Sequence, residues 1–200
     1  LQGYSNDSVV LSLFWGQGIE ARVGLGQNLA GDITEAAEKA VAQARGLRTD
    51  EPAFCLTTPE SMTANCTDIV EILQATLGST CPIVGGVSAD HREFGTTYQF
   101  AGSEVLSDSL PILLLWGEFQ ISCGVASGWQ PIGSTYTVTH SEGNVVYTIN
   151  DRPILEVFAD YWGDAEDLGV LGEFPLAVFP DPVNHEKFYL RAVFSTDSEA

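Results

Sequence analysis

The chain has 200 residues, of which 44% are hydrophobic and 18% are charged, so it can bury a core and is not a long disordered protein. Its 27 acidic and 8 basic residues give a formal net charge of -19. This charge argues against nucleic acid and anionic membranes as partners, because both are bound by clustered lysines and arginines. No apolar run approaches the roughly 20 residues of a membrane-spanning helix, so we expect a soluble protein without membrane contact.

The four cysteines have an irregular spacing, which favours neither a zinc site nor a disulfide framework. Cys55, Cys81 and Cys123 occur in apolar, strand-like runs, where a free cysteine behaves as a small hydrophobic residue. We therefore expect these three to be buried. We also expect all four to be reduced, including Cys66, and the protein to be cytoplasmic.

The first element in chain order is a predicted hairpin. Two β-rich runs, residues 8–15 and 19–25, flank the short loop Gly16-Gln17-Gly18. The sequence Gly24-Leu25-Gly26 follows, but it lacks the remaining glycine and the acidic residue of a dinucleotide-binding motif. We interpret it as a plain turn.

Two helices are predicted next, each from an acidic capping residue followed by an apolar stripe of helical period. Asp32 caps the first helix, over residues 33–45, and Asp68 caps the second, over residues 68–77. The alanines of the first helix permit close packing on a sheet.

Strands over residues 53–57 and 81–87 flank the second helix, which predicts a crossover between parallel strands. The later strand ends in Gly85-Gly86, where exposed backbone can approach a ligand at the edge of a sheet. A tight turn remains an equal alternative. Asp90 and His91 follow directly and can orient a polar ligand, although a solvated loop explains them as well.

The rest of the chain is predicted to be mainly antiparallel, with one more helix over residues 154–162. The expected strands cover residues 96–100, 105–106, 111–116, 119–126, 135–139, 145–149, 175–179 and 188–194. The predicted fold class is therefore α/β (α+β). It has mixed and antiparallel sheets flanked by helices, in two closely fused subdomains.

Two further side chains are candidate ligand contacts. Trp129 lies in the corner sequence Gly128-Trp-Gln-Pro-Ile-Gly133, where it can close a pocket or pack a seam. Arg152 can pair with a ligand carboxylate, with a helix-start ion pair as the alternative. We expect a pocket where the strand ending at Gly86 meets the Trp129 corner.

Several segments in order resemble the FIST sensory domain of bacterial signalling proteins. They are VGLG, the alanine-rich helix AAEKAVAQA, PIVGGVSAD, GVASGWQPIGSTYTVT, EGNVV and INDRPILEVFADYWG. The resemblance implies an N-terminal FIST half over residues 1–133 and the beginning of a C-terminal half over residues 134–200. It carries over no catalytic motif.

The resemblance implies a cytoplasmic module that senses a small molecule, such as an amino acid, without catalysis. Its partners would be that ligand and a signalling protein or fused output domain. The candidate ligand-binding residues are Gly85, Gly86, Asp90, His91, Trp129 and Arg152, and no metal site is expected. One alternative is a haem-based nitric oxide sensor, with His91, His140 or His185 as the axial ligand. Another is an enzyme, although the sequence assembles no catalytic group.

Overall fold

The computed structural model describes residues 11–90, 95–163, 174–193 and 195–196. The chain divides into two units, Leu1–Val125 and Ala126–Ala200, and each is described by itself. The described residues contain α-helices and both mixed and antiparallel sheets, which confirms the predicted fold class. No described helix is long and apolar enough to cross a membrane.

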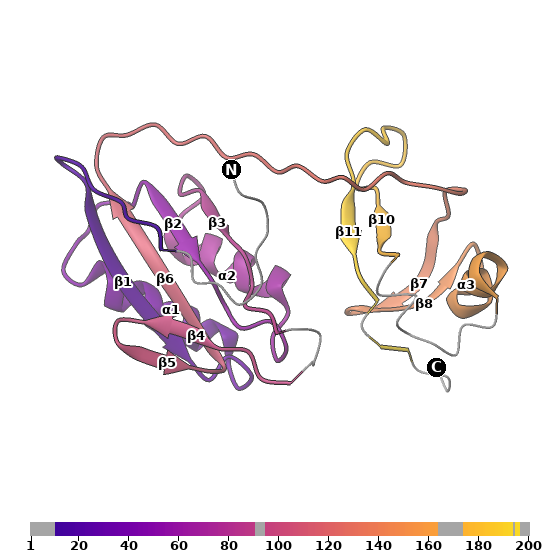
Figure 1. The fold of residues 1–200 in the computed structure, drawn as a ribbon, viewed down its shortest axis with the longest axis horizontal. Coiled ribbons are helices and arrows are strands. Elements are labelled where there is room, and N and C mark those ends of the chain that lie inside the picture. The colour runs from indigo at the N-terminus through magenta and orange to yellow at the C-terminus, as the bar shows by residue number, and fades with distance from the viewer. Residues whose placement is uncertain (1–10, 91–94, 164–173, 194, 197–200) are drawn as a thin grey trace. The chain divides into compact units, whose positions relative to one another are not determined.

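A four-stranded sheet forms the centre of the first unit (Figure 1). Its strands in spatial order are β1 (Glu20–Gln27), β6 (Ser109–Trp116), β2 (Phe54–Thr57) and β3 (Ile83–Gly85). β6 runs antiparallel to both of its neighbours, whereas β2 and β3 are parallel. The predicted parallel pair joined through a helix is therefore confirmed.

Two helices pack on the sheet, α1 (Ile33–Arg45) and α2 (Cys66–Leu77). The Asp32 side chain accepts a hydrogen bond from the backbone N–H of Glu35, so the predicted cap of α1 is confirmed. The predicted cap of α2 is wrong. Asn65 takes that role by accepting from the backbone N–H of Thr67, because the helix begins two residues before Asp68.

The contact between β1 and α1 is unusually close because glycine meets alanine there. A Cβ atom on Gly24 would overlap the carbonyl oxygen of Ala40, and one on Gly26 would overlap that of Ala36. Gly24 and Gly26 therefore lie inside a strand, and our interpretation of them as a turn is wrong. Their missing side chains let the helix backbone touch the sheet.

The two faces of the sheet are buried to different degrees. On the face of Gly24 and Gly26, the residues of β6 and β2 are buried, for example Leu114 and Cys55. The opposite face is also apolar, but most of its side chains are only partly covered: Val23, Phe54, Leu56, Val84, Leu113 and Leu115. Only the helix-covered face is a closed core.

A small hairpin precedes β6 in the chain and has its own two-stranded sheet. It consists of β4 (Gln99–Ala101) and β5 (Glu104–Leu106), joined by a turn in which Gly102 has φ 61°. The predicted antiparallel pair in this region is confirmed. Contacts between β4 and β6 attach the hairpin to the main sheet.

The second unit contains a meander, a helix and a separate strand pair. β7 (Val138–Glu142), β8 (Val145–Ile149) and β9 (Arg152–Pro153) form an antiparallel sheet in that order. The predicted third helix is confirmed as α3 (Ile154–Trp162), which packs on β8. β10 (Leu176–Val178) and β11 (Tyr189–Arg191) pair antiparallel.

Two predicted strands are absent from the described residues. Residues 11–19 contain no strand, and the predicted hairpin with β1 is therefore wrong for these residues. The other residues of its first run, 8–10, lie outside the described part of the chain. Residues 119–126 also contain no strand, and Cys123 is exposed rather than buried. Both runs have strand-forming side chains, but β6 ends before Gly117, and no described strand pairs with either run.

Cys55 and Cys81 are buried as predicted, and all four cysteines are free. Burial, together with the nearby Cys81 thiol, raises the pKa of Cys55 to about 12. Cys55 is therefore a thiol rather than a thiolate at neutral pH. It acts as a small apolar side chain within the core of the first unit.

The glycine contact predicts a large effect of one methyl group. We expect Gly26→Ala to lower the free energy of unfolding by about 2–3 kcal/mol, because the new Cβ collides with helix backbone that cannot move aside alone. Urea unfolding followed by circular dichroism measures this loss. Gly124→Ala is the control, because a Cβ there meets nothing, and it should stay within about 0.5 kcal/mol. Equal stability of the two variants would contradict the close packing.

Candidate functional site

A hollow of about 310 Å³ lies where the parallel strands β2 and β3 end. Its lining residues come from the loops after these strands and from the start of the hairpin: Thr58, Gly86, Val87, Ser88, Ala89, Tyr98, Gln99 and Phe100. The carboxyl ends of parallel strands are the usual ligand position in open α/β sheets. A second hollow of about 180 Å³ shares Thr58 and Phe100 and lies on the partly covered face of the sheet.

The backbone of the loop after β3 is fixed by hydrogen bonds to the loop after β2. The Gly86 N–H donates to the Thr57 carbonyl at 3.3 Å, and the Ser88 N–H donates to the Pro59 carbonyl at 2.9 Å. The Ser61 hydroxyl donates to the Ser88 carbonyl at 2.6 Å. This loop therefore extends the parallel pairing beyond the sheet and gives the hollow an ordered floor.

Two aromatic rings form the opposite wall. Tyr98 and Phe100 are two residues apart at the start of β4, so their side chains share one face of the hairpin, and both are exposed. Gln99 lies between them and is only 1% exposed. The hollow thus combines exposed aromatic surface with a polar backbone floor.

A buried polar network holds Gln99 in place. Its Oε1 accepts from the backbone N–H of Ser109 at 3.2 Å and from the Ser109 hydroxyl at 2.9 Å. Its Nε2 donates to the Thr97 hydroxyl at 3.1 Å, and that hydroxyl donates to Glu60 at 3.1 Å. Glu60 also accepts from the N–H of Met62 and from the N–H and hydroxyl of Thr63, at 2.6–2.7 Å. The network therefore ties β4 to β6 and to the loop before α2.

The hydrogen bonds decide the ionisation of Glu60, which is only 3% exposed. Burial by itself raises the pKa of this carboxyl, but the hydrogen bonds from Thr63, Met62 and Thr97 outweigh burial and hold the pKa below its usual value. Glu60 is therefore a buried carboxylate at neutral pH, and its charge lies beside Thr97, which links it to Gln99.

The structure brings some of the predicted site residues together. Gly86 lines the hollow, Gly85 ends β3 with its Cα against the Thr57 carbonyl, and Asp90 comes directly after the lining residue Ala89. The Asp90 carboxylate accepts from the Gly95 N–H at 2.8 Å. His91 lies outside the described residues.

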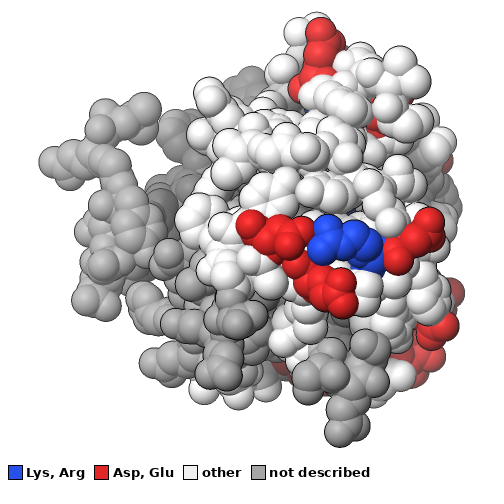
Figure 2. Space-filling model, turned by 90° about the vertical axis from the view of Figure 1, so that its right-hand side faces the viewer, with Lys and Arg blue, Asp and Glu red and all other residues white. Residues whose placement is uncertain are grey.

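Trp129 and Arg152 belong to the second unit. Trp129 is half exposed, and the Arg152 guanidinium donates to the Asp160 carboxylate at 2.8 Å rather than to its neighbour Asp151. That carboxylate raises the pKa of Arg152. On the face shown in Figure 2, acidic side chains flank the small basic area. A shared pocket of Trp129 and Arg152 with Gly86 stays a prediction.

Sequence reasoning missed the aromatic wall and its anchor. The alternation of Thr97, Tyr98, Gln99 and Phe100 shows two polar and two aromatic side chains on opposite faces of a strand. That pattern normally predicts buried rings and exposed polar groups. Here it is inverted, because Glu60 and Ser109 provide buried partners for Thr97 and Gln99.

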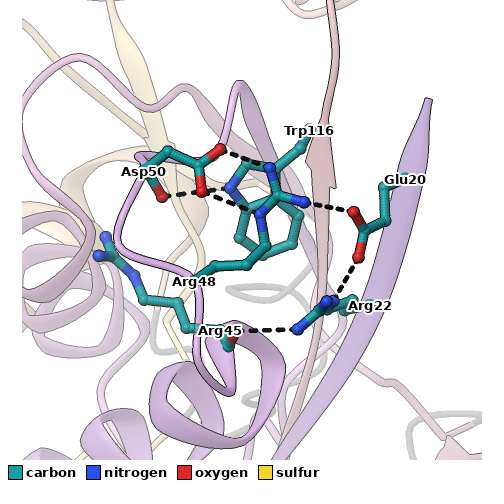
Figure 3. A network of polar contacts seen from close by, with 6 residues as sticks. All are labelled: Glu20, Arg22, Arg45, Arg48, Asp50 and Trp116. Atoms are coloured by element: carbon teal, nitrogen blue, oxygen red, sulfur yellow. Dashed lines mark hydrogen bonds and ion pairs between the residues drawn. The ribbon is translucent and has the colours of Figure 1, made fainter. Parts of the chain in front are cut away.

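A second polar network lies at the opposite end of the sheet, near Trp116 (Figure 3). The Arg48 guanidinium lies 4.9 Å from the centre of the Trp116 ring and pairs with Glu20 and Asp50. Arg22 donates to Glu20 and to the carbonyl of Arg45. These arginine contacts join the end of α1 to β1 and β6, so we interpret the cluster as structural.

The hollow shows no catalytic pairing among the described residues. The Ser88 hydroxyl lies 3.5 Å from the Thr58 carbonyl, and no described lining residue is a histidine. His140 is exposed and stacks on Tyr147, with 4.7 Å between ring centres, while His185 lies against Phe179. In the part of the chain that the structure describes, no cluster of three potential metal ligands occurs.

The Glu60 network predicts a pH-dependent contribution to stability. Glu60→Gln should destabilise the protein by about 2–3 kcal/mol at neutral pH, because the new amide would face N–H donors with an NH₂ group. Since the folded pKa of Glu60 is lowered, the carboxylate stabilises the protein above the unfolded pKa of about 4.3. This advantage falls as the pH drops through the folded pKa.

Urea unfolding between neutral pH and about pH 3 should therefore show the two proteins converging in acid. The exposed Glu104→Gln on the hairpin is the control and should change stability by less than about 0.5 kcal/mol. A Glu60→Gln deficit that stays constant over the whole pH range would refute the role of the Glu60 charge.

Comparison with known proteins places this geometry in a family context. The chain is 30% identical over 98 residues to an uncharacterized protein of Methanocaldococcus jannaschii, covering 47% of this chain and 19% of that protein. It is 34% identical over 114 residues to an uncharacterized protein of Mycobacterium tuberculosis, covering 55% of this chain and 29% of that protein. The chain thus spans less than a third of the length of these relatives.

The family match covers most of the chain. The model of the FIST N domain matches residues 1–152, which include the whole first unit with its hollow and the start of the second unit. FIST domains are sensory domains of signalling proteins. The division into halves at residues 133 and 134 stays a prediction. The match over 152 of the 200 residues shows that this chain belongs to the FIST family.

Proposed function

We propose that this chain is the ligand-binding part of a sensory protein and that it binds a small molecule, such as an amino acid, without catalysis. The observation that carries the proposal is the hollow at the carboxyl ends of β2 and β3. Its volume of about 310 Å³ is at the lower end of the range for ligand pockets, which favours a ligand of metabolite size.

The composition of the hollow supports binding rather than catalysis. Ligand sites combine apolar and aromatic surface with a few well-placed polar groups. Here Tyr98 and Phe100 supply the aromatic surface, and the fixed backbone around Gly86 and Ser88 supplies polar groups that need not reorganise. A preformed floor lowers the entropy that binding must overcome.

The hairpin is the element through which binding would reach a signalling partner. It has its own two-stranded sheet, and the Gln99 network anchors it to β6. A ligand that contacts Tyr98 and Phe100 favours one position of this hairpin over others, which is how binding energy shifts a population. The partner is then a separate signalling protein or a fused output domain. A cytoplasmic location stays our expectation.

A thermal-shift screen with the common L-amino acids tests the proposal. A ligand at about 100 times its dissociation constant should stabilise the chain by about 2.7 kcal/mol. Phe100→Ala should weaken the affinity for that ligand about tenfold, because it removes one aromatic wall of the hollow.

Leu47→Ala is the matched control, because Leu47 is fully exposed and does not line the hollow. It should bind the same ligand as well as the unmodified chain does. An affinity that Phe100→Ala leaves unchanged would show that the ligand binds elsewhere.

A further inference from the structure

The negative charge of Glu60 indicates which class of ligand the hollow would bind. Glu60 is 3% exposed, and every partner recorded for its carboxylate is an uncharged donor from Met62, Thr63 or Thr97. None of the described lining residues is a lysine or arginine. Within the described residues, the Glu60 charge is therefore stabilised by dipoles and is not neutralised by a cation.

This charge acts on the hollow over a short distance. Two hydrogen bonds of 3.1 Å, through the Thr97 hydroxyl, link Glu60 to the amide of the lining residue Gln99. Salt screens a partly buried charge far less than an exposed one. The chain as a whole also carries a net charge of -19. Among the described residues, the charge linked to the hollow is therefore negative, which favours a cation over an anion.

The aromatic rings of Tyr98 and Phe100 also attract cations. Tyr98 and Phe100 are 59% and 70% exposed, so their ring faces are open to a ligand in the hollow. The face of an aromatic ring carries partial negative charge and attracts ammonium groups.

We infer that the hollow binds an organic cation, with an alkylammonium group held against the exposed rings of Tyr98 and Phe100. The inference rests on the proposed function and narrows it to a ligand class. For an amino acid, the ammonium end is then the recognised end, and the carboxylate points away from the hollow.

Three probes that share a branched head of similar size and differ in charge test the inference on the full chain. They are choline, its uncharged carbon isostere dimethylbutanol, and the anion dimethylbutyrate. Isothermal titration should show choline binding at least about tenfold more tightly than the alcohol, and no measurable binding of the anion. A preference for the alcohol or the anion would overturn the inference.

Variants then locate the cation. Tyr98→Leu and Phe100→Leu keep an apolar side chain but lose the ring face, so each should weaken choline about threefold or more. Tyr189→Leu is the control, because Tyr189 is similarly exposed at 57% but lies in the second unit. Glu60→Gln, where it folds, should weaken choline and leave the affinity for dimethylbutanol unchanged. Choline affinity that neither aromatic variant lowers would place the cation elsewhere and overturn the inference.

The outcomes separate this inference from the proposed function. Equal binding of choline and dimethylbutanol, with both lowered by Phe100→Leu, overturns the charge preference and leaves the hollow as the ligand site. The same conclusion follows if choline fails to bind and an amino acid binds in a Phe100-dependent way. If neither choline nor any amino acid binds, both proposals fail.

Discussion

The structure depends on the close approach of α1 to β1, where glycine faces alanine. Gly24 and Gly26 have no side chains to hold the helix away, and Ala36 and Ala40 present backbone carbonyls directly to the strand. This packing brings the large side chains of β6, such as Leu114, under the helices and excludes water from them. Because the strand must remain free of side chains at these two positions, its sequence looks like a loop although it lies in the core.

The order of the strands separates two regions of different character. At the end of the sheet near Trp116, charged side chains are paired with one another, and Arg48 covers the indole ring. At the other end, β2 and β3 finish in loops whose backbone and neighbouring aromatic rings surround a hollow. The arginine and acidic side chains near Trp116 are therefore paired within the chain, whereas the other end presents groups that a ligand can use. This contrast places the candidate site.

Local signals predicted the elements that form from neighbouring residues. The cap at Asp32 and the alanine stripe predict α1 to the residue, and the strands on either side of α2 are found as a parallel pair. Residues 119–126 have strand-forming side chains too, but a strand also needs a partner, and pairing is not encoded locally. The same limit explains why residues 11–19, part of the predicted hairpin before β1, form no strand.

The candidate site was predicted in part for the same reason. Of the predicted residues, Gly86 lines the hollow, and glycines at the end of a strand are a local signal. Tyr98 and Phe100 were missed, since their exposure depends on the buried carboxylate of Glu60, which is far away in the sequence. When a distant partner buries the polar side chains of a strand, its apolar side chains are left exposed, which is the reverse of the usual burial pattern. Such reversals need the folded structure to be recognised.

Hydrogen–deuterium exchange tests most directly the claim that the ligand site lies at the ends of β2 and β3. The full chain is compared with and without a mixture of the common L-amino acids, and exchange is followed by peptide mass spectrometry. The account predicts slower exchange in peptides that cover residues 86–89 and 97–106, with little change in α1. Slower exchange confined to other parts of the chain, or no change anywhere, would contradict it.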